Sequence, residues 1–212
     1  YVPQGWYRIT ETLKMKPDTK LIGLHPFGTQ FRLDESTAAF SGFGGPKAMV
    51  ESSEGGANML VGIGINTGGY NYRAVGVKWM ANADSYMNDV KFVGGHGGLW
   101  KPKPGVEEPR GRWNRPARIS SPDNPVAASG MDLAWDNQYW SLWVTNNGGG
   151  TFKDIWTAST YATNGFYANN TSTPGRIYAM SIEHHVRNEV RFSKVSNWKV
   201  YCMQTEEESR ES

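Results

Sequence analysis

Residues 181 to 190, SIEHHVRNEV, contain two histidines, two glutamates and an arginine. Carboxyl, imidazole and guanidinium groups are the side chains that move protons, hold metal ions or bind hydroxyl groups. Such a segment can be a metal site, an acid–base centre or the charged edge of an ordinary strand. The direction in which each side chain points decides between them.

Neighbouring side chains of a β-strand point to opposite faces. We therefore expect Glu183, His185 and Arg187 to form a row on one polar face, with His184 pointing inward. A regular strand cannot aim two adjacent histidines at one ion, and the helical pattern of zinc proteases does not occur here. The segment predicts no metal site. Its polar row could bind sugar hydroxyls or supply an acid, or it could be an exposed charged face.

The end of the sequence, CMQTEEESRES, places carboxylates directly after an apolar strand. Gln204 and Glu206 share one face of that strand and together could hold a water molecule and a sugar hydroxyl. Glu206 and Glu183 are our two candidates for a general acid. A solvated acidic terminus is the alternative.

Two further candidates lie in turns. Asp84, in NADSYMNDV, could position water, although Asp and Asn also form turns. His96 lies between glycine pairs in GGHGGLW and could orient a substrate, or it could be a structural turn histidine.

The chain is rich in tryptophan, with nine among 212 residues. Flat aromatic faces can stack on sugar rings, and the same side chains can fill a core. Trp100, Trp113 and Trp140 are the stacking candidates. Trp113 stands among four arginines in RGRWNRPARIS, a combination that could bind an acidic polysaccharide or form a solvated loop.

The elements that position these residues are short and numerous. With 25 glycines and 11 prolines, the chain shows brief apolar alternations and little helical periodicity, which predicts an all-β protein. The spacings between RAVGVKWM and NDVKFVGG, and between AMSIEHH and EVRFSKV, are too short for crossover helices. This pattern fits a meander, a sandwich or a parallel β-solenoid.

The segment from about 100 to 130 interrupts this pattern. It contains six of the eleven prolines, and proline lacks the amide donor that a central strand needs. We expect a long loop in which residues 101–125 lie outside the regular coils and cover or border a groove.

The first 23 residues carry a resemblance. VPQGWYRITETLKMKPDTKLIG resembles the opening coil of the pectate-lyase-like right-handed parallel β-helix superfamily. NYRAVGVKWMANADSYMNDVKFVGG resembles a later coil of the family-55 and family-28-related glycoside hydrolases. The matching residues of the opening are Pro3, Gly5, Tyr7, Ile9, Thr12, Leu13, Met15, Thr19, Leu21, Ile22 and Gly23.

The resemblance implies a single right-handed parallel β-helix over residues 1–212, which we expect to be an incomplete or processed portion of a longer helix. It predicts parallel coils at 74–93 and 177–205. Apolar residues at alternate positions of a strand lie on one face, and we expect this face to be buried. This predicts six mostly buried side chains: Met180, Ile182, Val190, Phe192, Trp198 and Val200.

The resemblance also implies carbohydrate chemistry. We expect a glycoside hydrolase that uses carboxylate acid–base catalysis on a polysaccharide, without a cofactor. One alternative is a lyase for a uronate-containing polymer, for which calcium would be a cofactor. The other is a non-catalytic glycan-binding or structural β-helix, and a fold alone does not decide between them.

Composition and charge bear on which molecules the protein binds and on where in or outside the cell it acts. A net charge of +2 gives no support for nucleic-acid or acidic-membrane binding, and no apolar run is long enough to span a membrane. We expect an oligosaccharide or polysaccharide partner, and a further chain or segment could complete the helix. No signal peptide is visible, and we expect a secreted, extracellular or periplasmic protein. The single cysteine, Cys202, rules out an internal disulfide.

Overall fold

The computed structural model describes residues 1–94, 137–159, 161–185 and 187–206. Within these ranges the chain forms strands and turns, and every strand pairing is parallel. The same ranges contain no helix that is long and apolar enough to cross a membrane.

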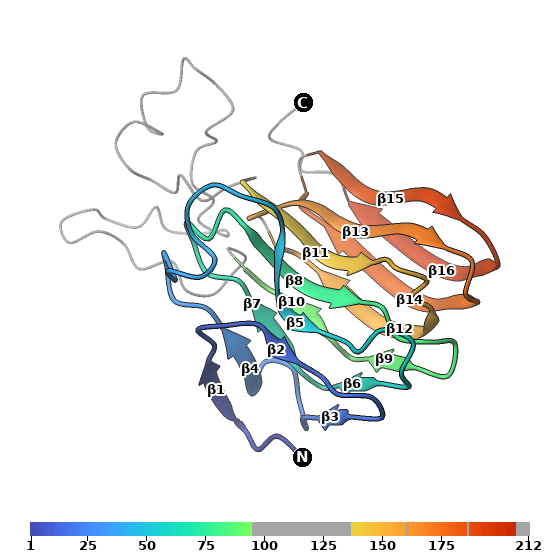
Figure 1. The fold of residues 1–212 in the computed structure, drawn as a ribbon, viewed down its shortest axis with the longest axis horizontal. Helices are drawn as coiled ribbons and strands as arrows, with labels where there is room; N and C mark the ends of the chain where they lie inside the picture. Colours follow the sequence, from blue (N-terminus) through green and yellow to red (C-terminus); the bar gives the residue numbers. More distant parts are fainter. Residues whose placement is uncertain (95–136, 160, 186, 207–212) are drawn as a thin grey trace.

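The strands form two sheets (Figure 1). Sheet B has six strands: β2 (Leu13–Lys14), β5 (Lys47–Glu51), β8 (Ala74–Trp79), β11 (Gln138–Val144), β13 (Ala162–Thr171) and β15 (Asn188–Val195). Sheet A has ten strands: β1 (Gly5–Arg8), β3 (Lys20–Ile22), β4 (Thr29–Arg32), β6 (Met59–Val61), β7 (Gly64–Asn66), β9 (Tyr86–Asn88), β10 (Lys91–Phe92), β12 (Gly150–Thr157), β14 (Gly175–Glu183) and β16 (Trp198–Glu206).

The chain alternates between the sheets, so each coil contains one strand of sheet B followed by a passage through sheet A. Repetition of this unit builds a solenoid of about six turns, from β1 at one end to β15 and β16 at the other (Figure 1). The predicted all-β parallel solenoid is therefore confirmed, including the parallel coils at 74–93 and 177–205.

Sheet A has two halves that meet at a bend. In the first three coils each half is a separate short strand, whereas β12, β14 and β16 run through both halves. The bend occupies one stacked position, where Gly62, Asp89, Asp154 and Ala179 have φ angles of 63°, 51°, 51° and 61°. This left-handed conformation turns the chain, and Gly and Asp adopt it more readily than Ala does.

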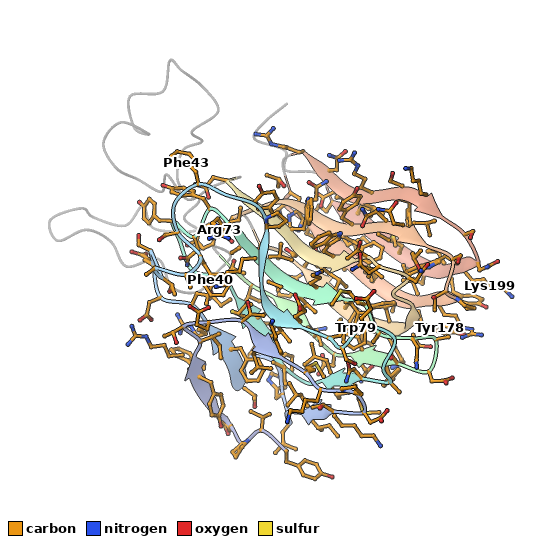
Figure 2. The ribbon with its side chains drawn as sticks, viewed as in Figure 1. Phe40, Phe43, Arg73, Trp79, Tyr178 and Lys199 are labelled. Carbon is orange, nitrogen blue, oxygen red and sulfur yellow. The ribbon has the colours of Figure 1, made fainter. Side chains whose placement is uncertain are left out.

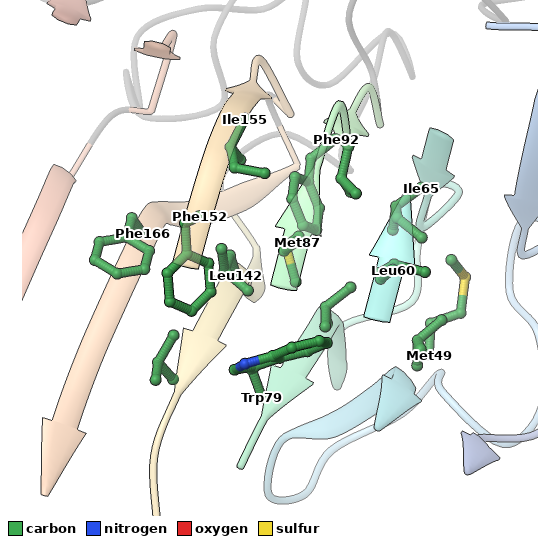
Figure 3. Close-up of a cluster of buried hydrophobic side chains, with 14 of the residues drawn as sticks. Met49, Leu60, Ile65, Trp79, Met87, Phe92, Leu142, Phe152, Ile155 and Phe166 are labelled. Carbon is green, nitrogen blue, oxygen red and sulfur yellow. The ribbon is translucent and has the colours of Figure 1, made fainter. Parts of the chain in front are cut away.

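The core lies between the two sheets (Figure 3). The rings of Trp79, Phe152 and Phe166 come from successive coils and pack edge to face, with centroids 6.2 and 6.3 Å apart. Trp79 is fully buried, and its indole N–H donates to the Gly149 carbonyl oxygen at 3.0 Å. The core thus runs along the solenoid axis, and each coil contributes to it.

The prediction of buried side chains holds for β14 and fails in part for the last coil. Met180 and Ile182 are buried. Phe192 and Val200 are 43% and 47% exposed, and the other two predicted side chains are half-buried. The difference arises because β15 and β16 each pair with one neighbouring strand within the described residues, whereas β12, β13 and β14 are covered on both sides.

Candidate functional site

Polar and aromatic side chains gather on the outer face of the second half of sheet A, near the end of β14 and β16. We call Trp156, Ser181, Glu183, Gln204 and Glu206 the carboxylate face. Two rows of residues on neighbouring strands form it. In the first row Trp156 of β12 pairs with Ser181 of β14, which pairs with Gln204 of β16, and in the second row Glu183 pairs with Glu206. The face exists because the core takes the alternate positions of the same strands.

The register of β14 and β16 brings together three residues that the sequence analysis identifies as candidates in two separate segments. Glu183, Gln204 and Glu206 all lie at this end of two paired strands. Neighbouring strands run about 4.8 Å apart, so the Glu183 and Glu206 backbones are that close. Gln204 and Glu206 both lie on an exposed stretch of β16.

Glu183 is held by its neighbours. The Ser181 hydroxyl donates to Glu183 Oε1 at 2.5 Å, and His184 Nε2 lies 3.8 Å from Glu183 Oε2. The Glu183 side chain is only 16% exposed, whereas Glu206 is exposed. The His184 amide donates to the Glu206 carbonyl oxygen at 3.1 Å, which fixes the backbones of the two glutamates relative to each other.

An aromatic contact extends the face toward the first coils. Phe27, from the turn between β3 and β4, lies edge-on to Trp156 with ring centroids 6.1 Å apart. His25 lies against Phe27 at 5.7 Å. Because Phe27 belongs to the first coil and Trp156 to the fourth, this turn folds over the intervening strands. The result is a cluster of three rings that includes Trp156 of the carboxylate face.

Both histidines of the opening segment are buried, which overturns the predicted outward row. β14 ends at Glu183, and His184 has a φ angle of +64°, so the regular alternation stops there. His185 Nδ1 lies 3.2 Å from the Ala162 carbonyl oxygen, and His185 Nε2 lies 3.0 Å from the Thr157 hydroxyl. The ring is neutral, since burial lowers the pKa of His185 to about 4.

The substrate-binding prediction for His185 is therefore wrong, because its ring is enclosed by protein atoms. The inward direction predicted for His184 is confirmed by its burial. Arg187 is exposed but lies beyond the end of β14, directly before β15, and so does not continue a row from Glu183.

Asp84 lies away from the carboxylate face. It occupies the turn before β9, where its amide donates to Asn82 Oδ1 at 2.9 Å. Through Thr151, β9 is in register with the beginning of β14, whereas Glu183 is the last residue of β14. At roughly 3.3 Å per residue, about 20 Å or more separates them along the strand. Asp84 and Glu183 therefore do not form one catalytic pair.

Trp140 belongs to another surface, on sheet B. Its ring contacts Trp143 and Tyr167 at centroid distances of 4.7 and 4.9 Å. Lys78 lies over the Trp143 ring at 5.4 Å, and Arg191 lies over Tyr167 at 5.0 Å. These cations already cover part of the aromatic faces, so the cluster is a packed aromatic–cation ladder.

The remaining nominated residues, His96, Trp100 and Trp113, lie outside the described residues, as does the expected loop at about 100–130. Sequence reasoning missed Trp156 and Ser181. The aromatic residue in TFKDIWTAS could have indicated Trp156 as a stacking residue. Strict alternation, however, puts Trp156 on the same inward face as Phe152, whereas the left-handed backbone of Asp154 shifts the alternation so that Trp156 points outward.

Within the described residues, no group of three or more His, Cys, Asp or Glu side chains is placed to hold a metal ion. Comparison with known proteins found no family model that matches the sequence and no matching curated protein. The parallel β-solenoid is consistent with the β-helix fold that the resemblance implies, and the comparisons give no evidence for a pectate-lyase or glycoside-hydrolase family.

Proposed function

We propose that the protein is a glycoside hydrolase that binds a polysaccharide along the carboxylate face. The observation that carries the proposal is the register pairing of Glu183 with Glu206. Retaining glycosidases use two carboxyl groups about 5–5.5 Å apart, and side chains on neighbouring strands about 4.8 Å apart can meet this spacing. The parallel β-helix, which is common among carbohydrate-active enzymes, is consistent with this chemistry.

The environments of the two glutamates support different roles. Glu183 is oriented by the Ser181 hydroxyl and is largely enclosed, which suits a nucleophile aimed at the anomeric carbon. In this proposal Glu206, which is exposed at the edge strand, takes the second role: it protonates the leaving oxygen and then activates a water molecule from the solvent. Trp156 and Gln204 would contact the sugar through an aromatic face and an amide.

The test is hydrolysis of a panel of neutral and acidic polysaccharides, followed by the appearance of reducing ends. On any polymer that is cleaved, Glu183→Gln and Glu206→Gln should each lower the rate by roughly a hundred- to ten-thousand-fold. Glu51→Gln is the matched control, because Glu51 pairs with Lys78 on sheet B and should keep full activity. Circular dichroism and thermal unfolding would establish that each variant is folded.

Three results would contradict the proposal. Full activity of the double variant Glu183→Gln/Glu206→Gln would show that neither glutamate takes part in the chemistry. Absorbance of unsaturated uronates among the products would indicate a lyase instead. Saturable binding of a polysaccharide without any product during long incubation would indicate a non-catalytic glycan-binding module.

A further inference from the structure

A second surface lies on the first half of sheet A, where β14 and β16 carry Arg176, Tyr178, Lys199 and Tyr201. We call these four residues the tyrosine platform. All four are exposed, with Tyr178 at 39% and Tyr201 at 57%. Tyr178 lies on β14 and Lys199 on the neighbouring strand β16, and both are labelled in Figure 2. The platform precedes the bend at Ala179, and the carboxylate face follows it.

The two tyrosine rings form a flat stack. Their centroids are 4.6 Å apart and their planes differ by 5°. A stacked pair on neighbouring strands contributes to the stability of a sheet, and this contribution would be present in the absence of any ligand. Tyr201, however, is on the edge strand β16, so one face of its ring is not covered by a further strand within the described residues. That face can receive the flat side of a sugar ring.

Two exposed cations, Arg176 and Lys199, lie beside the rings. Arg176 and Lys199 are register neighbours on β14 and β16, and the described residues provide neither with an ion pair. Like charges directly opposite each other destabilise a sheet. The next residues in the same row are Thr151 and Tyr86, which carry no negative charge. A bound anion would relieve the repulsion between the two cations.

We propose that the tyrosine platform binds an anionic glycan, a chain that carries carboxylate or sulfate groups. The sugar ring stacks on Tyr201, and the acidic group lies between the guanidinium of Arg176 and the ammonium of Lys199. A single-stranded nucleic acid fits less well, because the closed tyrosine stack offers one ring face, whereas single-strand sites provide several rings on which successive bases stack. The site is independent of the hydrolase proposal, although one polymer could run along β14 and β16 across both surfaces.

The test is affinity electrophoresis and calorimetry with polygalacturonate, a sulfated dextran, unsulfated dextran and a single-stranded oligonucleotide. Measurements use the Glu183→Gln protein, so that binding is scored without cleavage of the polymer. We expect the anionic glycans to bind and unsulfated dextran to bind weakly or not at all. Raising the salt concentration about tenfold should weaken binding, because exposed charges are screened.

Variants assign the binding to the platform. Tyr201→Ala and the double variant Arg176→Gln/Lys199→Gln should each weaken glycan binding by roughly five- to tenfold or more. Tyr1→Ala is the control for an exposed tyrosine, and Lys14→Gln/Lys20→Gln is the control for two removed charges. Both controls should bind like the parent protein. Tyr201→Ala should unfold at a slightly lower temperature because the stack is lost, and circular dichroism should show that every variant remains folded.

Several outcomes would overturn the proposal. Equal binding of dextran and the anionic glycans would remove the charge requirement, and an unchanged affinity in both platform variants would place the ligand elsewhere. Tighter binding of the oligonucleotide, lost in the same variants, would make the platform a nucleic-acid site. Absence of binding by all four polymers would also refute the proposal, whether or not the protein hydrolyses a polysaccharide.

Discussion

At the scale of single residues, His185 links the fold to pH. Its folded pKa of about 4 lies below the usual value of 6.5, because burial disfavours the charged ring. The unfolded chain therefore binds the extra proton first as the pH falls, and stability is lost between about pH 6.5 and 4. The neighbouring His184 adds to the shift in the same direction.

We expect the free energy of unfolding to fall by about 2 kcal/mol more between pH 7 and pH 5 in the parent protein than in His185→Gln. The reason is that the glutamine side chain of this variant does not take up a proton between pH 7 and pH 5. Urea unfolding at the two pH values measures the difference. His25→Gln, which removes an exposed histidine instead, is the control for the loss of an imidazole. Equal pH dependence in the parent and His185→Gln would show that this ring does not become protonated on unfolding.

Single residues also show how far the sequence predicts the site. The alternation of side chains along a strand predicts that Glu183 points outward and His184 inward, and both directions are correct. The same rule failed for His185, because it assumes that the strand continues past Glu183. The pairing of Glu183 with Glu206 could not be derived from either segment alone, because register depends on how two consecutive coils align.

At the scale of elements, the stacked bend in sheet A explains the remaining errors. Ala179 has a φ angle of 61°, so Ile177 points inward, Tyr178 outward and Met180 inward again. Strict alternation predicts that Tyr178 and Met180 share the apolar face. A left-handed residue in a strand is rarely visible when it is alanine, whereas Gly62 at the same position of another coil is an ordinary signal.

This bend gives a stability prediction. Ala179→Gly should raise the free energy of unfolding by about 0.5–1 kcal/mol, because glycine avoids the left-handed penalty but costs more chain entropy. Asp154→Gly should gain less, since aspartate tolerates this conformation and its bond to Lys153 is lost. Gly62→Ala should be destabilising, because the added Cβ would collide with the Gly23 carbonyl oxygen.

Denaturant unfolding of the three variants measures these changes. We expect Ala179→Gly to be the most stable of the three variants, Asp154→Gly to be intermediate and Gly62→Ala to be the least stable. A lower stability of Ala179→Gly than of the parent would mean that the alanine methyl group contributes more to packing at the bend than its backbone strain costs.

At the scale of the whole molecule, the coils differ in how completely they are covered. Trp79 and Phe152, in the third and fourth coils, are fully buried, whereas Phe192 and Val200 in the last coil remain substantially exposed. In a solenoid each repeat packs mainly against its neighbours, so stability is approximately a sum of local terms along the axis. The contact between Phe27 of the first coil and Trp156 of the fourth is an exception here. A coil with one neighbour has fewer of these terms than a coil with two.

Hydrogen exchange should therefore be graded along the solenoid axis. We expect amides of β8, β11 and β12 to exchange slowest and those of β15 and β16 to exchange sooner, because local opening of the last coil breaks contacts on one side only. Phe192→Ala should speed exchange in β15 and β16 and leave β8 almost unchanged. Phe152→Ala, which removes a ring in contact with both Trp79 and Phe166, should destabilise the protein by about 3–5 kcal/mol and speed exchange across several coils. Equal protection in all coils, lost together in both variants, would instead mean that the solenoid unfolds as a single cooperative unit.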